Sequence, residues 1–249
     1  MPRLNDQTLE TVNIKGTNFQ YSAVRLDTLG ATEYTLVTII TDVSGSVASY
    51  KNDLESCLQE IIHACLKSPR ADNLLIRLLT FNTHVDEVHG YKLLTNCNPD
   101  DYKNILHCGG GTALYDASIN GIEAALSYGK TLVDKDFSVN GIVFVLTDGD
   151  NNASIYSRAK VKESLDKAVK NEILESMVSI LIGVGVGDPI IDDYLDKYHK
   201  ESGFTQYAKI SEATKNKLAK LAEFVSKSIS SQSQSLNQKI PSQPLSLTI

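Results

Sequence analysis

Three short stretches of this sequence carry oxygen-bearing side chains of the types and spacing that hold a hard metal ion. Asp42, Ser44 and Ser46 alternate directly after an apolar run. Thr112 follows three glycines, and Asp148 follows a second apolar run. Carboxylates and hydroxyls without thiolate or imidazole favour Mg²⁺ or Mn²⁺ over Zn²⁺, and the small number of ligands favours them over Ca²⁺. These five side chains are therefore candidate metal ligands.

The elements around these stretches are typical of an α/β protein. From Tyr34 onward, short apolar runs alternate with helical patterns, which predicts a mostly parallel central sheet of about six strands with helices on both faces. The link before Val85 is so short that 85–93 is predicted to be an antiparallel edge strand. The expected strands are 34–41, 73–81, 85–93, 141–147, 177–184 and 204–210, and the expected helices are about 47–65, 113–126, 157–171, 189–203 and 212–228.

This arrangement would bring the candidate ligands together. Loops that follow parallel strands meet at the carboxyl edge of the sheet, where ligands bind. Asp42 and Asp148 follow two such strands, and Thr112 opens a helix after glycines 109–111, which permit tight turns. Two carboxylates and three neutral hydroxyls would leave the ion electrophilic, with a position for water or an incoming carboxylate.

The motifs DVSGS at Asp42–Ser46, GGT before Ala113 and TDG at Thr147–Gly149 resemble the metal-ion-dependent adhesion site of von Willebrand factor A (vWA) domains. The resemblance covers about Tyr34–Ser228 and implies a Rossmann-like vWA domain. It implies that the first motif supplies three ligands, that Thr112 is the ligand of the second loop, and that the aspartate of TDG is the ligand of the third, often through water.

An open metal position with no evident nucleophile and base pair around it predicts a non-enzymatic protein–protein interaction module. Its Mg²⁺ or Mn²⁺ would coordinate an Asp or Glu of a partner, and the resemblance implies an intracellular multiprotein assembly that can include an AAA-type ATPase. A metal-dependent phosphohydrolase on a similar sheet is the alternative. Phosphatases that use a strand-end aspartate generally need a second acid two residues on, and here that position is Ser44.

Composition excludes several other classes. A net charge of −6, without a basic cluster, argues against a general binder of nucleic acid or of anionic membranes. Met1–Thr11 is too polar for a secretory signal, and no later run is long enough to span a bilayer, so we expect a soluble, cytoplasmic protein. The four cysteines lack paired spacing and are expected to be reduced thiols. A zinc site at His107 and Cys108 has little support.

The expected organisation is an N-terminal extension (1–33), one vWA domain (34–228) and a C-terminal tail (229–249). Strand-like residues 11–14 and 19–24 could extend the sheet or cover an edge. The tail is rich in Ser and Gln and contains two prolines, which predicts mobility unless it docks.

Several polar residues near the motifs have two interpretations. Ser46 is predicted to cap the first helix in addition to binding metal. Residues 150–152 are either rim residues or an ordinary polar loop, and the loop is favoured. Asp116 either orients a ligand or is a helical surface carboxylate, and His107 is either a base near the metal or a loop histidine without function.

Overall fold

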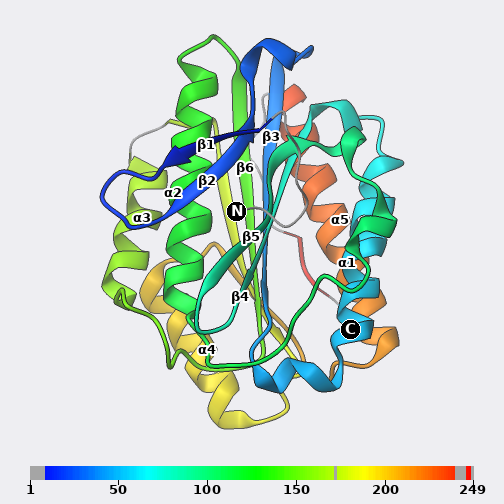
Figure 1. Cartoon of the computed structure of the whole chain (residues 1–249), viewed down its shortest axis with the longest axis vertical. Coiled ribbons are helices and arrows are strands. Elements are labelled where there is room, and N and C mark those ends of the chain that lie inside the picture. Colours follow the sequence, from blue (N-terminus) through cyan, green and yellow to red (C-terminus); the bar gives the residue numbers. More distant parts are fainter. Residues whose placement is uncertain (1–8, 171–172, 239–244, 248–249) are drawn as a thin grey trace.

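An eight-stranded sheet runs through the middle of the molecule, with helices on both faces (Figure 1). The computed structural model describes residues 9–170, 173–238 and 245–247. The strands are β1 (Leu9–Asn13), β2 (Gln20–Val24), β3 (Glu33–Asp42), β4 (Leu74–Phe81), β5 (Val85–Leu93), β6 (Ser138–Thr147), β7 (Met177–Val184) and β8 (Gln206–Ile210). The α-helices are α1 (Lys51–Leu66), α2 (Leu114–Val133), α3 (Arg158–Lys170), α4 (Pro189–Ser202) and α5 (Lys215–Gln238).

The sheet order is β1-β2-β5-β4-β3-β6-β7-β8, and β4, β3, β6, β7 and β8 form a continuous parallel block. The predicted mostly parallel α/β fold is therefore confirmed. β5 pairs antiparallel with β4, as predicted. However, β5 does not form the edge of the sheet. The hairpin of β1 and β2 continues the sheet beyond it, and β1 is the outermost strand on that side.

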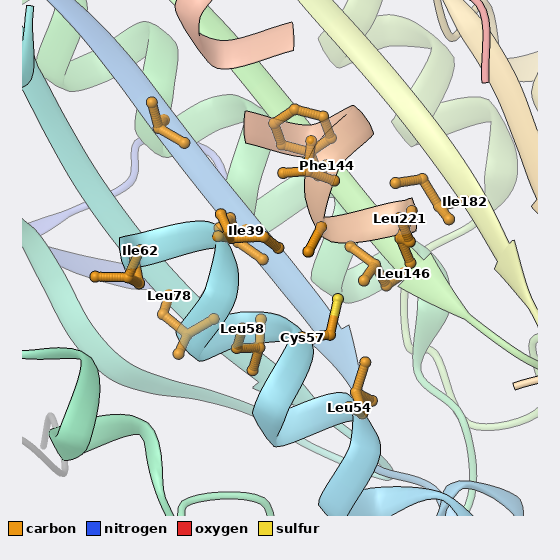
Figure 2. Packing of buried hydrophobic residues seen from close by; sticks show 14 of the residues in the cluster. Ile39, Leu54, Cys57, Leu58, Ile62, Leu78, Phe144, Leu146, Ile182 and Leu221 are labelled. Carbon is orange, nitrogen blue, oxygen red and sulfur yellow. The ribbon is translucent and has the colours of Figure 1, made fainter. Parts of the chain in front are cut away.

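Alternation along the strands builds a separate apolar core on each face. In β3, Val37 and Ile39 join the core under α1 and α5, whereas Leu36 and Ile40 join the core under α2, α3 and α4. Figure 1 shows this division of the helices between the two faces. Figure 2 shows α1 and α5 side chains meeting those of β3, β4, β6 and β7 in the first core. Both faces are covered, as a parallel sheet requires.

The hairpin of β1 and β2 meets the rest of the sheet at one point of very close approach. Ala23 pairs with Tyr91, and the backbone of Ser22 lies where a side chain at Gly90 would have to sit. At the same point β2 is also held by a side chain, because both carboxylate oxygens of Glu87 accept from the Ser22 N–H, at 3.1 and 3.2 Å. Only glycine permits this approach without displacing the hairpin.

Helix α5 differs from the prediction. It continues ten residues past Ser228, so the predicted boundary of the tail falls inside a helix. Residues 229–238 carry few apolar side chains, but Ile229 and Leu236 are buried and Gln232 is bonded to the sheet. Its Nε2 donates to Gly141 O at 3.0 Å and to the Ser176 hydroxyl at 3.0 Å. Amino-acid composition predicted mobility because it cannot show that the polar side chain of Gln232 is buried and hydrogen-bonded. Residues 239–244 and 248–249 of the predicted tail lie outside the described residues.

We expect Gln232→Ala to lower the free energy of unfolding by about 1–3 kcal/mol, because it removes a donor from the buried Gly141 carbonyl and from the Ser176 hydroxyl. Gln234→Ala is the matched control: it removes the same side chain from an exposed position of the same helix and should change stability by less than about 0.5 kcal/mol. Urea unfolding of the two variants measures the difference. Equal midpoints would show that the Gln232 hydrogen bonds do not hold α5 on the sheet.

The four cysteines, all within the described residues, form no disulfide bond, and Cys57, Cys65 and Cys97 are buried. Among the described helices, none combines the length and the apolar character needed to cross a lipid bilayer.

Candidate metal centre

The two predicted aspartates leave neighbouring strands at one edge of the sheet. β3 and β6 are parallel and paired through Thr41 and Leu146, so Asp42 and Asp148 start adjacent loops. The second loop reaches the same edge through the backbone. Gly109 N donates to Val43 O at 2.9 Å, and Gly45 N donates to Gly110 O at 3.3 Å. All three motifs therefore meet at the carboxyl ends of the strands, as the sequence predicted.

Hydrogen bonds connect four of the five candidate ligands. The Ser46 hydroxyl donates to Asp148 Oδ1 at 2.8 Å, and the hydroxyl oxygens of Ser44 and Ser46 lie 3.2 Å apart. Asp42 Oδ1 accepts from Ser44 N at 2.8 Å, and its Oδ2 accepts from the Thr147 hydroxyl at 2.6 Å. Residues more than a hundred positions apart thus form one continuous cluster of oxygens.

Thr112, the fifth candidate, lies at the same edge but is held differently. It is buried, its N–H donates to Asn152 Oδ1 at 2.7 Å, and its carbonyl accepts from Asn152 N at 3.0 Å. Its hydroxyl takes no part in the bonds that join the other four residues. The loop before it is tight: at Gly110, with φ +78°, a Cβ would lie 2.7 Å from Thr83 Oγ1. That position requires glycine both for its backbone conformation and for space.

The spacing of the oxygens fits an octahedral ion of the size of Mg²⁺. Ligands about 2.1 Å from such an ion lie roughly 3 Å from one another when they are adjacent in the shell. The Ser44–Ser46 and Ser46–Asp148 oxygens are 3.2 and 2.8 Å apart. Within the described part of the chain, no three His, Cys, Asp or Glu side chains gather in a way that suits a metal ion. An ion at this edge would therefore depend on hydroxyl ligands.

The cluster is buried at its base and open at its top. Asp42 is 2% exposed, whereas Gly45, Ser46 and Gly110 are exposed to solvent. Burial raises the pKa of Asp42 to about 6, against the lowering effect of its hydrogen bonds from Thr147 and Ser44. A carboxylate whose charge is disfavoured by burial gains most from a cation placed beside it.

Tyr50 is a site residue that the sequence prediction missed. Its hydroxyl donates to Asp148 Oδ2 at 2.9 Å, so that Ser46 and Tyr50 each hold one oxygen of that carboxylate. Tyr50 occupies the position before α1, after a 3-10 turn over Gly45–Ser49. The predicted cap by Ser46 is therefore wrong, because the α-helix starts later and the Ser46 hydroxyl faces Asp148. Only the four-residue spacing from Ser46 could have indicated Tyr50.

The loop after Asp148 is hydrogen-bonded to the Thr112 loop and to the start of α2. Asn152 holds Thr112, and Asn151 Oδ1 accepts from the Ser154 hydroxyl. Asp116 is buried, and its carboxylate accepts from the backbone N–H groups of Ile155 and Tyr156, both at 2.9 Å. Of the two interpretations given for Asp116, the helical surface carboxylate is therefore wrong, because the side chain is buried. His107 and Asp150 are exposed.

Comparisons with known proteins agree on the fold. No family model matches the chain, and no curated protein matches it in sequence. Solved structures that resemble it include the PilB minor pilin of Streptococcus sanguinis, with a TM-score of 0.56, 16% identity and coverage of 83% of this chain and 64% of the pilin. The pilus adhesin SpaC of Lactobacillus rhamnosus GG, in its open conformation, has a TM-score of 0.56, 11% identity and coverage of 86% and 32%.

A third neighbour is proximal thread matrix protein 1 of the mussel byssus, solved with a zinc-occupied MIDAS motif. Its TM-score is 0.51 at 18% identity, with coverage of 79% of this chain and 46% of the byssus protein. The chain spans less than two thirds of the length of each of these three neighbours. At these identities the likeness concerns the fold alone, and it shows that the chain has a vWA-like α/β fold.

Proposed function

We propose that this chain is a protein-interaction module in which Asp42, Ser44, Ser46, Thr112 and Asp148 hold Mg²⁺ or Mn²⁺, and in which the ion coordinates an Asp or Glu side chain of a partner protein. The observation that carries the proposal is the cluster of oxygens from Ser44, Ser46 and Asp148 at octahedral spacing on an exposed edge. The byssus protein supports it, because a neighbour of this fold has a MIDAS motif occupied by a metal.

The proposed partner is defined by its chemistry. A partner carboxylate would complete the shell of an ion that has only two carboxylates from the chain itself, Asp42 and Asp148. By their names the neighbours are a minor pilin, a pilus adhesin and a byssus matrix protein, and none of these names points to an AAA-type ATPase assembly. That assembly and the cytoplasmic location stay predictions from the sequence.

Ser46→Ala tests the metal site directly. The substitution removes one proposed ligand and the donor to Asp148, so the affinity for Mg²⁺ should fall by at least about tenfold. Ser49→Ala is the control, because that exposed hydroxyl donates to the Ser46 carbonyl, at 3.4 Å, and not to a proposed ligand atom. Isothermal titration with MgCl₂ and MnCl₂ measures both variants. Equal affinity of Ser46→Ala and the parent chain would remove the site from consideration.

Tyr50→Phe should weaken Mg²⁺ binding by about tenfold without removing a proposed ligand, because Asp148 loses one of the two donors that orient it. The same titration measures this effect. Tyr128→Phe loses a hydroxyl that bonds to Val24 O, away from the candidate centre, and should bind Mg²⁺ as the parent does. A Tyr50→Phe affinity matching that of Tyr128→Phe would show that Tyr50 does not position the carboxylate.

We further propose that the module is not an enzyme. Ser44 stands where a phosphatase of the alternative class would place its second acid, and its hydroxyl lies against Ser46. An assay of p-nitrophenyl phosphate hydrolysis should show no Mg²⁺-dependent turnover above that of Ser46→Ala. Turnover that requires both Mg²⁺ and Ser46 would favour the phosphohydrolase instead.

A further inference from the structure

A few large apolar side chains are conspicuously exposed, and one of them lies beside the candidate metal centre. Among the described residues, those more than a third exposed are Val12, Val133, Ile155, Val169 and Ile190. Single exposed apolar residues are common and need no explanation by themselves. Ile155 is the most exposed of the five, at 85%, and it belongs to the loop that follows Asp148. Val169, at 79%, lies at the far end of α3, toward the opposite edge of the sheet.

Hydrogen bonds to neighbouring elements fix the backbone that presents Ile155. Its own N–H and that of Tyr156 donate to the two oxygens of Asp116, which is 5% exposed. The Ser154 hydroxyl accepts from Tyr115 N at 3.0 Å, and the Tyr156 hydroxyl accepts from Asn18 N at 3.0 Å. The loop is thus bonded to the start of α2 and to the turn between β1 and β2. A side chain held on such a rigid loop loses little conformational entropy on binding.

The same loop ties Ile155 to the candidate ion ligands. Asn152, three residues earlier, exchanges side-chain and backbone hydrogen bonds with Thr112. Three residues of extended chain span at most about 11 Å, so Ile155 lies within that distance of Asn152, the residue that is bonded to Thr112. Ile190, 76% exposed at the start of α4, flanks the same edge. The Tyr194 hydroxyl, one turn further along α4, accepts from Asn151 N at 3.1 Å.

We propose, resting on the proposed function, that Ile155 selects the partner: the segment that places its Asp or Glu on the ion also places an apolar side chain against Ile155. At about 3.3 Å per extended residue, the span of at most about 11 Å from Asn152 to Ile155 corresponds to about three residues, and we place the apolar residue of the partner two to four positions from its acid. The partner is therefore a protein segment with an acidic residue and an apolar residue two to four positions apart. Burial of the exposed isoleucine is worth about tenfold in affinity.

The test uses the full chain and a phage library that displays a fixed aspartate with randomised residues on both sides. The library is selected in Mg²⁺ and bound phage are released with EDTA, in parallel on the parent, on Ile155→Ser and on Val169→Ser. The expected parent pool is enriched in apolar residues at one position two to four residues from the aspartate. Val169→Ser should select the same pool, because Val169 is almost equally exposed but distant from the centre.

Ile155→Ser is expected to release a pool with EDTA that lacks this apolar position. Peptides synthesised from the parent pool should bind Ile155→Ser about tenfold more weakly and Val169→Ser unchanged. The same apolar enrichment on Ile155→Ser, or equal affinity of the peptides for it, would overturn the role of Ile155 and leave the metal site standing. A parent chain that yields no EDTA-released pool would overturn the proposed function, and the role of Ile155 with it.

Discussion

Asp42→Asn is expected to raise the free energy of unfolding of the chelator-treated protein at pH 7 by about 1–3 kcal/mol and to abolish stabilisation by Mg²⁺. Burial raises the pKa of Asp42 to about 6 from 3.8. At neutral pH the charged carboxylate therefore lowers the free energy of unfolding. Asn keeps the hydrogen bonds: its carbonyl accepts from Ser44 N, and its amide donates to Thr147 Oγ1, whose hydrogen turns to Gly149 O. The variant removes the cost of the charge together with a proposed ligand.

The pH dependence follows from the same shift. Between about pH 4 and pH 6 the folded protein holds a proton on Asp42 that the unfolded chain releases, so the contribution of this group to stability falls as pH rises through that window. Asp42→Asn should lack that fall. Asp150→Asn, on an exposed neighbouring position, is the control and should keep it. Thermal unfolding of all three proteins with EDTA and with MgCl₂ measures both effects. If Asp42→Asn lowers the free energy of unfolding at pH 7 in EDTA, the buried charge of Asp42 does not destabilise the folded protein.

Glu87→Leu is expected to lower the free energy of unfolding by about 3–5 kcal/mol, because it strands the charge of a fully buried arginine. Arg77 is 0% exposed, and its Nε donates to Glu87 Oε2 at 2.6 Å. Its Nη2 donates to Asn120 Oδ1 at 2.9 Å, and its guanidinium carbon lies 5.8 Å from the Tyr91 ring centroid. Asn120 and Tyr91 carry no charge, so neither can take over from the carboxylate.

The double variant Arg77→Met/Glu87→Leu separates the cost of a stranded charge from the cost of lost packing. It should recover the part of the stability lost by Glu87→Leu that comes from the stranded charge, since an apolar pair of similar volume needs no counter-charge, whereas the acceptor that Glu87 provides for the Ser22 N–H stays missing. Asp193→Ala breaks the exposed ion pair with Lys197 and should cost less than about 0.5 kcal/mol. Urea unfolding measures all of these proteins. A double variant as unstable as Glu87→Leu alone would mean that the pair is needed for reasons other than charge balance.

The sequence was most informative where strand and loop patterns coincide. Asp42 and Asp148 each follow a buried strand of the parallel block, and strand direction alone places such residues at one edge. The glycines before Thr112 indicated a tight turn, and Gly110 has the positive φ that this requires. These features are local in the chain, which is why they could be predicted without knowledge of packing.

What the sequence did not indicate depends on contacts between distant residues. Asp116 gives no sign that it will accept two backbone hydrogen bonds from a loop some forty positions on. Gln232 sits in a polar stretch whose composition predicts mobility, yet its amide bonds to β6. The hairpin of β1 and β2 joins β5 because Gly90 leaves room for Ser22, a fit that no periodicity reveals. Each of these contacts depends on which residues the fold brings together, and the local sequence does not show that.

The oxygens of Ser44, Ser46 and Asp148 are already held near the spacing that an ion would demand. For an ion bound by these three side chains, the two loops that carry them would have little to rearrange, and the slow step of capture would be the loss of water from the ion itself. Mg²⁺ sheds water reluctantly. The choice of cation would then affect the rates at which this protein associates with its partner and dissociates from it more than the equilibrium affinity.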